Sequence, residues 1–430
     1  MKNIPQLFIQ NVVWRGLFYI TSFILNLAIA RHFEAGASGV IYYLITSYAF
    51  ITLLLSISFE SAIVYFTSNE EIKKSKLFGL SIIWLISSGV LLLLFFGFIK
   101  YTYPESVYAK HGTHGVLFIC GNLLTAFMSG FFYAHKNFKF SNIIGIVINA
   151  LLILLIVLVN EKGVLNNNIY LNVYFGSYLL QGAILAIALI KSSNIFREDL
   201  FPTKVELKKI FNYLLIVFTC NIITFLCYRI DYWFVHYFCT PKELGNYIQV
   251  SKLVQMFFVF PSILAAVVFP LTAGGNKKQI KDLLGMVSRL ILITYAVLCL
   301  LLTITGKWLF PFMFGDSFTE MYSSFLFYIP GIICFSSLYI LSAYYSGKGK
   351  AIVNMKGGLI AMTTIIVGDA LLIPRFGIKA AAGVSSVGYL LYFLYVLRIF
   401  MKEYDVTIKQ FFYLHFEDLN KIKKIIFRDN

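Results

Sequence analysis

Long apolar segments separated by short polar clusters dominate the chain. The segment from Leu77 to Ile99 runs for 23 residues without a charge, and the segment from Met321 to Gly347 runs for 27. A helix needs about 20 apolar residues to cross a hydrocarbon core. The pattern therefore predicts twelve transmembrane helices, at 9–30, 38–66, 77–99, 113–134, 141–159, 169–190, 208–236, 244–270, 284–305, 320–346, 352–373 and 379–401.

The composition agrees with helices in lipid. The chain is 59% hydrophobic and 13% charged, with a mean hydropathy of +0.79, whereas soluble domains are about 25% charged. The alternation of a membrane β-barrel strand is absent from the apolar segments, and open strands leave backbone amides unpaired in lipid. Six cysteines without a C-x-x-C motif are expected to be apolar packing residues, and six scattered histidines indicate no metal site. We therefore predict an all-α integral membrane protein without a cofactor.

The basic residues predict the orientation in the membrane. If the N-terminus is cytoplasmic, the inner loops and the tail hold 25 of the 36 lysines and arginines, the outer loops hold 8, and Arg15, Arg229 and Lys252 lie within spans. Since lysine and arginine accumulate on the cytoplasmic side, we expect both termini there. Basic residues spread over every inner loop do not form a nucleic-acid-binding patch, so no nucleic-acid partner is expected. The first apolar segment has no convincing cleavage site and is expected to be a retained span.

A weak internal repeat suggests two halves. The segment 31–43, RHFEAGASGVIYY, and the segment 236–247, HYFCTPKELGNY, each run from phenylalanine through a polar turn and glycine to tyrosine. One follows the first span and the other follows the seventh, which predicts two six-helix halves in the same orientation with a substrate site between them. We place the N-terminal lobe at 1–203, the C-terminal lobe at 204–402 and a basic cytoplasmic tail at 403–430. The tail is expected to lie on anionic lipid or to be solvated.

The segment from Asp231 to Val254, DYWFVHYFCTPKELGNYIQVSKLV, resembles the seventh-to-eighth helix signature of polysaccharide flippases in the multidrug/oligosaccharidyl-lipid/polysaccharide (MOP) superfamily. Further similarities follow in order along nearly the whole chain, at ILNLAIARHFEAGASGVIYY, SFESAIVYF, Phe260-Pro261, Phe269-Pro270, Gly315 to Phe318, Pro330-Gly331, Gly347 to Lys350 with Asn354, and IPRFGIKAAAG. The resemblance implies a carrier of the Wzx type in the bacterial cytoplasmic (inner) membrane. It would move undecaprenyl-pyrophosphate-linked oligosaccharide repeat units from the cytoplasmic to the outer leaflet for O-antigen, capsule or exopolysaccharide assembly. It would act as a monomer, with a polysaccharide polymerase and a chain-length regulator as candidate partners.

Charges inside spans are costly, about 2.5 to 3.5 kcal/mol each, and usually face a partner or a watery cavity. We expect the cations Arg15, Arg229 and Lys252 to line the cavity and bind the pyrophosphate, because arginine binds phosphate through two hydrogen bonds and lysine supplies a point charge. The alternative is structural: Arg15 pairs with Glu60 and Arg229 pairs with Asp231, or the side chains snorkel.

Three acids also lie in predicted spans, namely Glu60, Asp231 and Asp369. Each is a candidate site for a coupling proton or sodium ion, or a structural group. A coupling ion is not required if the membrane potential drives export of two negative charges, which is worth about 4 to 5 kcal/mol per 100 mV.

Other side chains have simpler expected roles. Four prolines would kink or end helices and supply the flexing points for alternating access, namely Pro261, Pro270, Pro330 and Pro374. Tyrosines near predicted helix ends are expected to form an interfacial belt, namely Tyr42, Tyr43, Tyr247, Tyr344 and Tyr345.

Three other functions compete with a polysaccharide flippase. A cation-coupled drug or metabolite antiporter of the MATE type in the same superfamily would need an acidic ion site in the N-terminal half, where Glu60 is the only deep candidate. A lipid II flippase typically has fourteen helices, and twelve are predicted here. A membrane-bound glycosyltransferase or polymerase would need a long catalytic loop with clustered acids or histidines, and no interhelical loop is long enough. We therefore do not expect an enzyme.

Overall fold

A computed structural model describes residues 4–162, 167–192, 199–274, 277–408 and 411, and within these ranges the regular structure is entirely helical. Most helices are long because the apolar segments hold few helix-breaking residues, and because lipid requires every backbone group to be satisfied within the segment. The elements in chain order are α1 (Ile4–Ser56), α2 (Phe59–Ser68), α3 (Lys74–Thr102), α4 (Val107–Lys110), α5 (Gly112–Ala134), α6 (Phe138–Lys162), α7 (Asn167–Ser192), α8 (Lys204–Phe238), α9 (Pro241–Phe257), α10 (Val259–Gly274), α11 (Lys277–Phe314), the 3-10 turn η2 (Asp316–Phe318), α12 (Met321–Gly347) and α13 (Ala351–Tyr404).

The prediction of a twelve-span all-α membrane fold is confirmed. In the described part of the chain, ten helices are long and apolar enough to cross a membrane. Two of these helices each contain two predicted spans joined by a sharp turn, at Glu34 in α1 (φ 58°, ψ 179°) and at Gly377 in α13 (φ 59°, ψ −146°). Glycine tolerates positive φ without a steric cost, which explains the turn at Gly377. The cytoplasmic placement of both termini stays a prediction.

The chain divides into two compact units. One unit contains Met1–Glu34 and Val40–Ile222, and the other contains Ala35–Gly39 and Ile223–Asn430. The division therefore falls within α8, and the predicted lobe boundary falls before this helix, between residues 203 and 204. We call them the N-terminal unit and the C-terminal unit and describe each by itself. The predicted tail after residue 408, apart from Phe411, lies outside the described residues.

Two predicted spans are interrupted. The span predicted at 38–66 breaks between α1 and α2, where Ile57 and Ser58 have positive φ values of 43° and 60°. The indole of Trp84 donates a hydrogen bond of 2.7 Å to the carbonyl of Leu55, and the amide of Asn221 donates one of 2.9 Å to the hydroxyl of Ser58. Since a freed backbone group is costly in lipid, the bond from Trp84 makes the break tolerable, and the bond from Asn221 holds the side chain of Ser58. The span predicted at 244–270 is likewise divided into α9 and α10 at Phe258.

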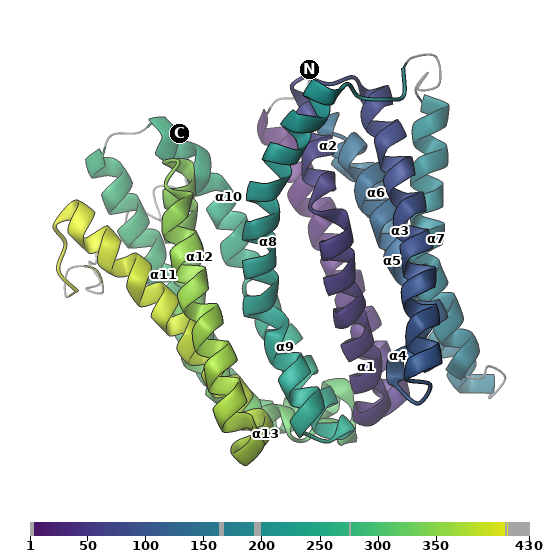
Figure 1. Ribbon diagram of the computed structural model, residues 1–430. Coiled ribbons are helices and arrows are strands. Elements are labelled where there is room, and N and C mark those ends of the chain that lie inside the picture. The colour runs from purple at the N-terminus through teal and green to yellow at the C-terminus, as the bar shows by residue number, and fades with distance from the viewer. Residues whose placement is uncertain (1–3, 163–166, 193–198, 275–276, 409–410, 412–430) are drawn as a thin grey trace. The chain divides into compact units, whose positions relative to one another are not determined.

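Small residues bring helices close together within each unit. In the N-terminal unit, a β-carbon on Gly121 of α5 would lie 2.4 Å from the backbone nitrogen of Leu179 in α7. In the C-terminal unit, α12 and α13 run side by side (Figure 1), and the hydroxyl of Ser386 accepts a hydrogen bond of 2.6 Å from the backbone nitrogen of Gly331. Close approach at small residues is how membrane helices gain packing energy without a hydrophobic driving force between them.

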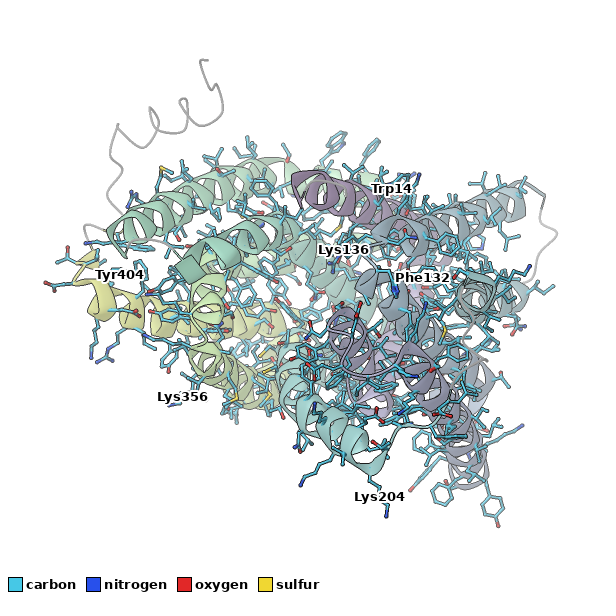
Figure 2. The ribbon with its side chains drawn as sticks, turned by 90° about the horizontal axis from the view of Figure 1, so that it is seen from above. Trp14, Phe132, Lys136, Lys204, Lys356 and Tyr404 are labelled. Atoms are coloured by element: carbon cyan, nitrogen blue, oxygen red, sulfur yellow. The ribbon has the colours of Figure 1, made fainter. Side chains whose placement is uncertain are left out.

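Two lysines near helix starts are exposed. Figure 2 shows the side chains of Lys204, at the start of α8, and Lys356, near the start of α13, directed away from the neighbouring helices, and both residues are exposed. These positions are the ones expected of lysines that lie at the ends of spans, outside the hydrocarbon.

Candidate functional site

The C-terminal unit holds a pair of buried acids. Asp231 on α8 is 2% exposed and Asp369 on α13 is 0% exposed, and the two carboxylates interact electrostatically. One oxygen of Asp231, Oδ2, accepts hydrogen bonds from the hydroxyl of Tyr247 on α9 and, at 3.2 Å, from that of Ser385 on α13. The sequence named both acids separately, and the fold brings them together.

Three oxygens of this acid pair have no hydrogen-bond partner. They are Oδ1 of Asp231 and both Oδ1 and Oδ2 of Asp369, and all three are buried. Burial of unpaired negative charge is very costly, so the pair requires a proton or a cation for neutrality. Carboxylate and hydroxyl oxygens are the ligands that hard cations prefer. The arrangement can therefore hold a proton or a small hard cation.

The tyrosine next to the acids corrects one expectation. Tyr247 is fully buried, and its hydroxyl also lies 2.7 Å from the hydroxyl of Tyr328 on α12. The other four tyrosines assigned to an interfacial belt are buried as well, so none of the five is exposed as a lipid-facing belt side chain would be. A position near a helix end does not distinguish a belt tyrosine from one whose hydroxyl bonds inside a helix bundle. Ser385 could not be recognised as a functional residue from the sequence, because only its place in a run of small residues marks it there.

The same unit holds two of the predicted cations. The guanidinium of Arg229, two residues before Asp231 on α8, donates hydrogen bonds to the hydroxyl of Tyr232 at 2.8 Å and to Oε1 of Gln255 at 2.7 Å, and lies 5.2 Å from the ring centroid of Tyr232. It interacts electrostatically with Asp231 and with Lys252 on α9. No direct ion pair joins Arg229 to Asp231 in the described structure, because the guanidinium is directed to neutral partners. Its charge is therefore held in place without being cancelled by contact.

The remaining predicted cation stands apart from its expected partner. Arg15 on α1 is exposed and lies over the ring of Tyr19, 5.8 Å from its centroid. Among the described residues it forms no ion pair with Glu60, which lies in the first turn of α2. The structural pairing of Arg15 with Glu60 that the sequence allowed is therefore not formed.

Glu60 instead lines a cavity of about 440 Å³ within the N-terminal unit, together with side chains from α1, α2, α5, α6 and α7. One oxygen of this carboxylate, Oε2, is buried and has no hydrogen-bond partner. Glu60 is the second residue of α2, directly after the break at Ser58. The first turn of a helix exposes unpaired N–H groups, which favour a nearby negative charge.

The four predicted hinge prolines occupy different kinds of position. Pro261 is in the first turn of α10, after the break at Phe258, where the missing N–H costs nothing. Pro270 lies near the end of the same helix. Pro330 lies inside α12, and Pro374 comes three residues before the turn at Gly377. Their role in alternating access stays a prediction. Within the described ranges, no group of three or more histidines, cysteines, aspartates or glutamates could hold a metal ion.

Comparisons with known proteins identify the fold. No protein-family model and no curated protein matches the sequence. Among solved structures, lipid II flippase MurJ in an inward closed conformation is similar with a TM-score of 0.69 and 16% identity, over 96% of this chain and 93% of that one. An inward-facing multidrug resistance MATE family transporter is similar with a TM-score of 0.63 and 10% identity, over 91% of this chain and 96% of that one. A MOP superfamily transporter from Pyrococcus furiosus is similar with a TM-score of 0.61 and 10% identity, over 93% of this chain and 95% of that one.

These similarities cover nearly the whole chain, at identities that establish the fold alone. All three structures are transporters or flippases, and the helical architecture agrees with theirs. The protein is therefore a multi-pass membrane protein with the fold of the MOP transporter superfamily.

Proposed function

We propose that the protein translocates an undecaprenyl-pyrophosphate-linked oligosaccharide from the cytoplasmic to the outer leaflet of a bacterial inner membrane, for surface polysaccharide assembly. The observation that carries the proposal is the pair of cations Arg229 and Lys252, of which Arg229 also acts electrostatically on Asp231. The similarity to a solved lipid II flippase supports a lipid-linked substrate. A polymerase and a chain-length regulator remain candidate partners.

The two cations suit a pyrophosphate. A low-dielectric path rejects an anion unless fixed positive charge compensates it. Arg229 offers a planar guanidinium already oriented by Tyr232 and Gln255, and Lys252 adds a point charge. The role of Arg15, in the N-terminal unit, as a pyrophosphate ligand stays a prediction.

The acid pair suits a coupling ion. Because Arg229 acts electrostatically on Asp231, a pyrophosphate bound to Arg229 would reduce the positive field at the carboxylates and so favour a cation there. Binding coupling is reciprocal, so a cation on the acids would also favour the anion. This gives sodium or proton binding a direct influence on substrate affinity.

The test is complementation in the native host. After deletion of the chain, lipid-linked oligosaccharide should accumulate on the cytoplasmic face, and wild type should restore export. Lys252→Ala and Asp369→Asn should each lower export about tenfold or more at unchanged membrane abundance, since each removes one charged-group interaction worth about 1.5–3 kcal/mol. Arg375→Ala, which changes an exposed arginine near the turn in α13, is the control.

Two outcomes would overturn the proposal. Absence of an accumulated intermediate would remove the substrate assignment. Equal loss of export and abundance in Lys252→Ala would assign this lysine a structural role.

If collapse of the membrane potential at fixed ion gradients stopped export while Asp369→Asn did not, the potential would be the driving force in place of a coupling ion.

A cation-coupled antiporter is the second candidate. The observation that favours it is the cavity in the N-terminal unit with an unpartnered oxygen of Glu60, because this function needs an acidic site in that half. MATE transporters also share the fold. Efflux of a cationic dye that requires Glu60, in a strain with no accumulated oligosaccharide, would establish this function instead.

A further inference from the structure

The cavity beside Glu60 is too large for a single ion. It measures about 440 Å³, whereas a water molecule in the liquid takes about 30 Å³. Cavities of roughly 300–1,000 Å³ are typical of small-molecule sites. A bare sodium ion or proton would leave most of this space to water, so the volume of the cavity indicates an organic ligand.

The polar lining favours a ligand rich in hydrogen-bond donors. The amide nitrogens of Asn122 and Asn142 donate to the carbonyls of Phe118 and Phe138 in their own helices, at 3.0 and 2.6 Å. An amide has two donor hydrogens and one acceptor oxygen, so each bond uses one of the two hydrogens and leaves the oxygen as an acceptor.

Hydroxyl groups of the lining also form hydrogen bonds within the protein. The hydroxyl of Thr125 donates to the carbonyl of Tyr178 at 3.3 Å, and those of Ser129 and Ser141 bond to each other at 2.7 Å. Glu60 adds a carboxylate with one unpartnered oxygen. Among the residues that line the cavity, Glu60 is the charged one, and its charge is negative.

Aromatic rings provide the apolar part of the wall. Phe18 from α1 and Tyr133 from α5 both line the cavity. An apolar wall with a few convergent polar groups is the usual form of a site that fixes the orientation of its ligand. The C–H groups of a sugar ring can pack on such side chains while its hydroxyls reach the polar ones.

We propose that this cavity binds a protonated amino sugar, with its ammonium group on the carboxylate of Glu60 and its hydroxyls donating to the amide oxygens of Asn122 and Asn142. An ammonium has three donors and no acceptor, which complements a carboxylate with an unpartnered oxygen. That the amino sugar belongs to the transported glycan rests on the proposed function, whereas the binding itself does not.

Binding to the purified full chain in lipid nanodiscs tests the proposal, with calorimetry and three probes. D-glucosamine carries the ammonium and the hydroxyls, D-glucose lacks the ammonium, and cyclohexylamine lacks the hydroxyls. Glucosamine should bind at least about tenfold more tightly than either probe. Compared with glucose it adds a charge-assisted hydrogen bond, and compared with cyclohexylamine it adds the hydrogen bonds of several hydroxyls. Glu60→Gln should remove this advantage over glucose, and Glu60→Asp should retain part of it.

Glu105→Gln is the matched control, because Glu105 is a highly exposed acid that pairs with Lys110 outside the cavity. It should leave all three affinities unchanged. Equal affinity for glucosamine and glucose would overturn the role of Glu60, and equal affinity for cyclohexylamine would replace the amino sugar with a free organic amine. The comparison of probes on wild type stands even if a variant fails to fold. Failure of the transport assay with intact glucosamine binding would reject the flippase and not this site.

Discussion

At the scale of single residues, Gly245 in α9 has no space for a side chain. A β-carbon there would lie 1.8 Å from the carbonyl oxygen of Ala35. We expect Gly245→Ala to lower stability by about 1–3 kcal/mol, because overpacking forces the backbone apart. Thermal unfolding of the detergent-purified protein measures this. Gly97→Ala on α3 is the control, since nothing lies within 4 Å of that position; equal melting temperatures for the two variants would contradict the close contact.

A histidine pair gives the protein a predictable response to pH. Nδ1 of His111 lies 3.1 Å from Nδ1 of His114, whose Nε2 lies 2.8 Å from Oδ1 of Asn172. Burial, and secondly the neighbouring His114, lower the pKa of His111 from its ordinary value of 6.5. The folded state therefore resists a proton that the unfolded chain accepts, so stability is complete above about pH 6.5 and falls as the pH drops below it.

The melting temperature should accordingly fall between about pH 7 and pH 5, and His111→Gln should reduce that fall. His135→Gln is the control, because His135 bonds to the carbonyl of Phe131 in its own helix turn. An unchanged pH dependence in His111→Gln would show that this pair does not titrate as inferred.

At the scale of elements, the break between α1 and α2 depends on Trp84. Its indole bonds to the carbonyl of Leu55, and its ring stacks on Phe59 at a centroid distance of 5.3 Å. Trp84→Phe keeps an aromatic ring but leaves that carbonyl unsatisfied, so we expect a loss of about 1–3 kcal/mol, measured by thermal unfolding. Trp308→Phe, at an exposed position stacked on Phe312, should have little effect. Similar losses in both would assign the effect to general loss of tryptophan.

At the scale of the whole molecule, the distribution of basic residues predicts which side each loop faces. In a variant without the six native cysteines, Lys204→Cys and Lys356→Cys should react with a membrane-impermeant thiol reagent only in inside-out vesicles. Glu105→Cys, between α3 and α5, should react only in intact cells. Labelling of all three from one side would reject the predicted topology.

The sequence predicted the helices better than their interruptions. Hydropathy places spans because lipid demands about 20 apolar residues of each, and it located the turns at Glu34 and Gly377 between predicted spans. The break at Ile57 and Ser58 lies in an apolar stretch without proline or glycine. It depends on side chains of α3 and α8, which are distant in sequence, so no local pattern could reveal it.

The sequence by itself determined the class of protein, the number of spans and the small set of intramembrane charges, because the cost of charge in lipid makes each of them conspicuous. Only the tertiary structure decided how those charges combine. It brought Asp231 and Asp369 together, directed Arg229 to neutral partners, and left Glu60 in a cavity instead of pairing it with Arg15. Which faces of separate helices meet is fixed by packing between segments far apart in the chain, and hydropathy along one segment carries no information about that packing.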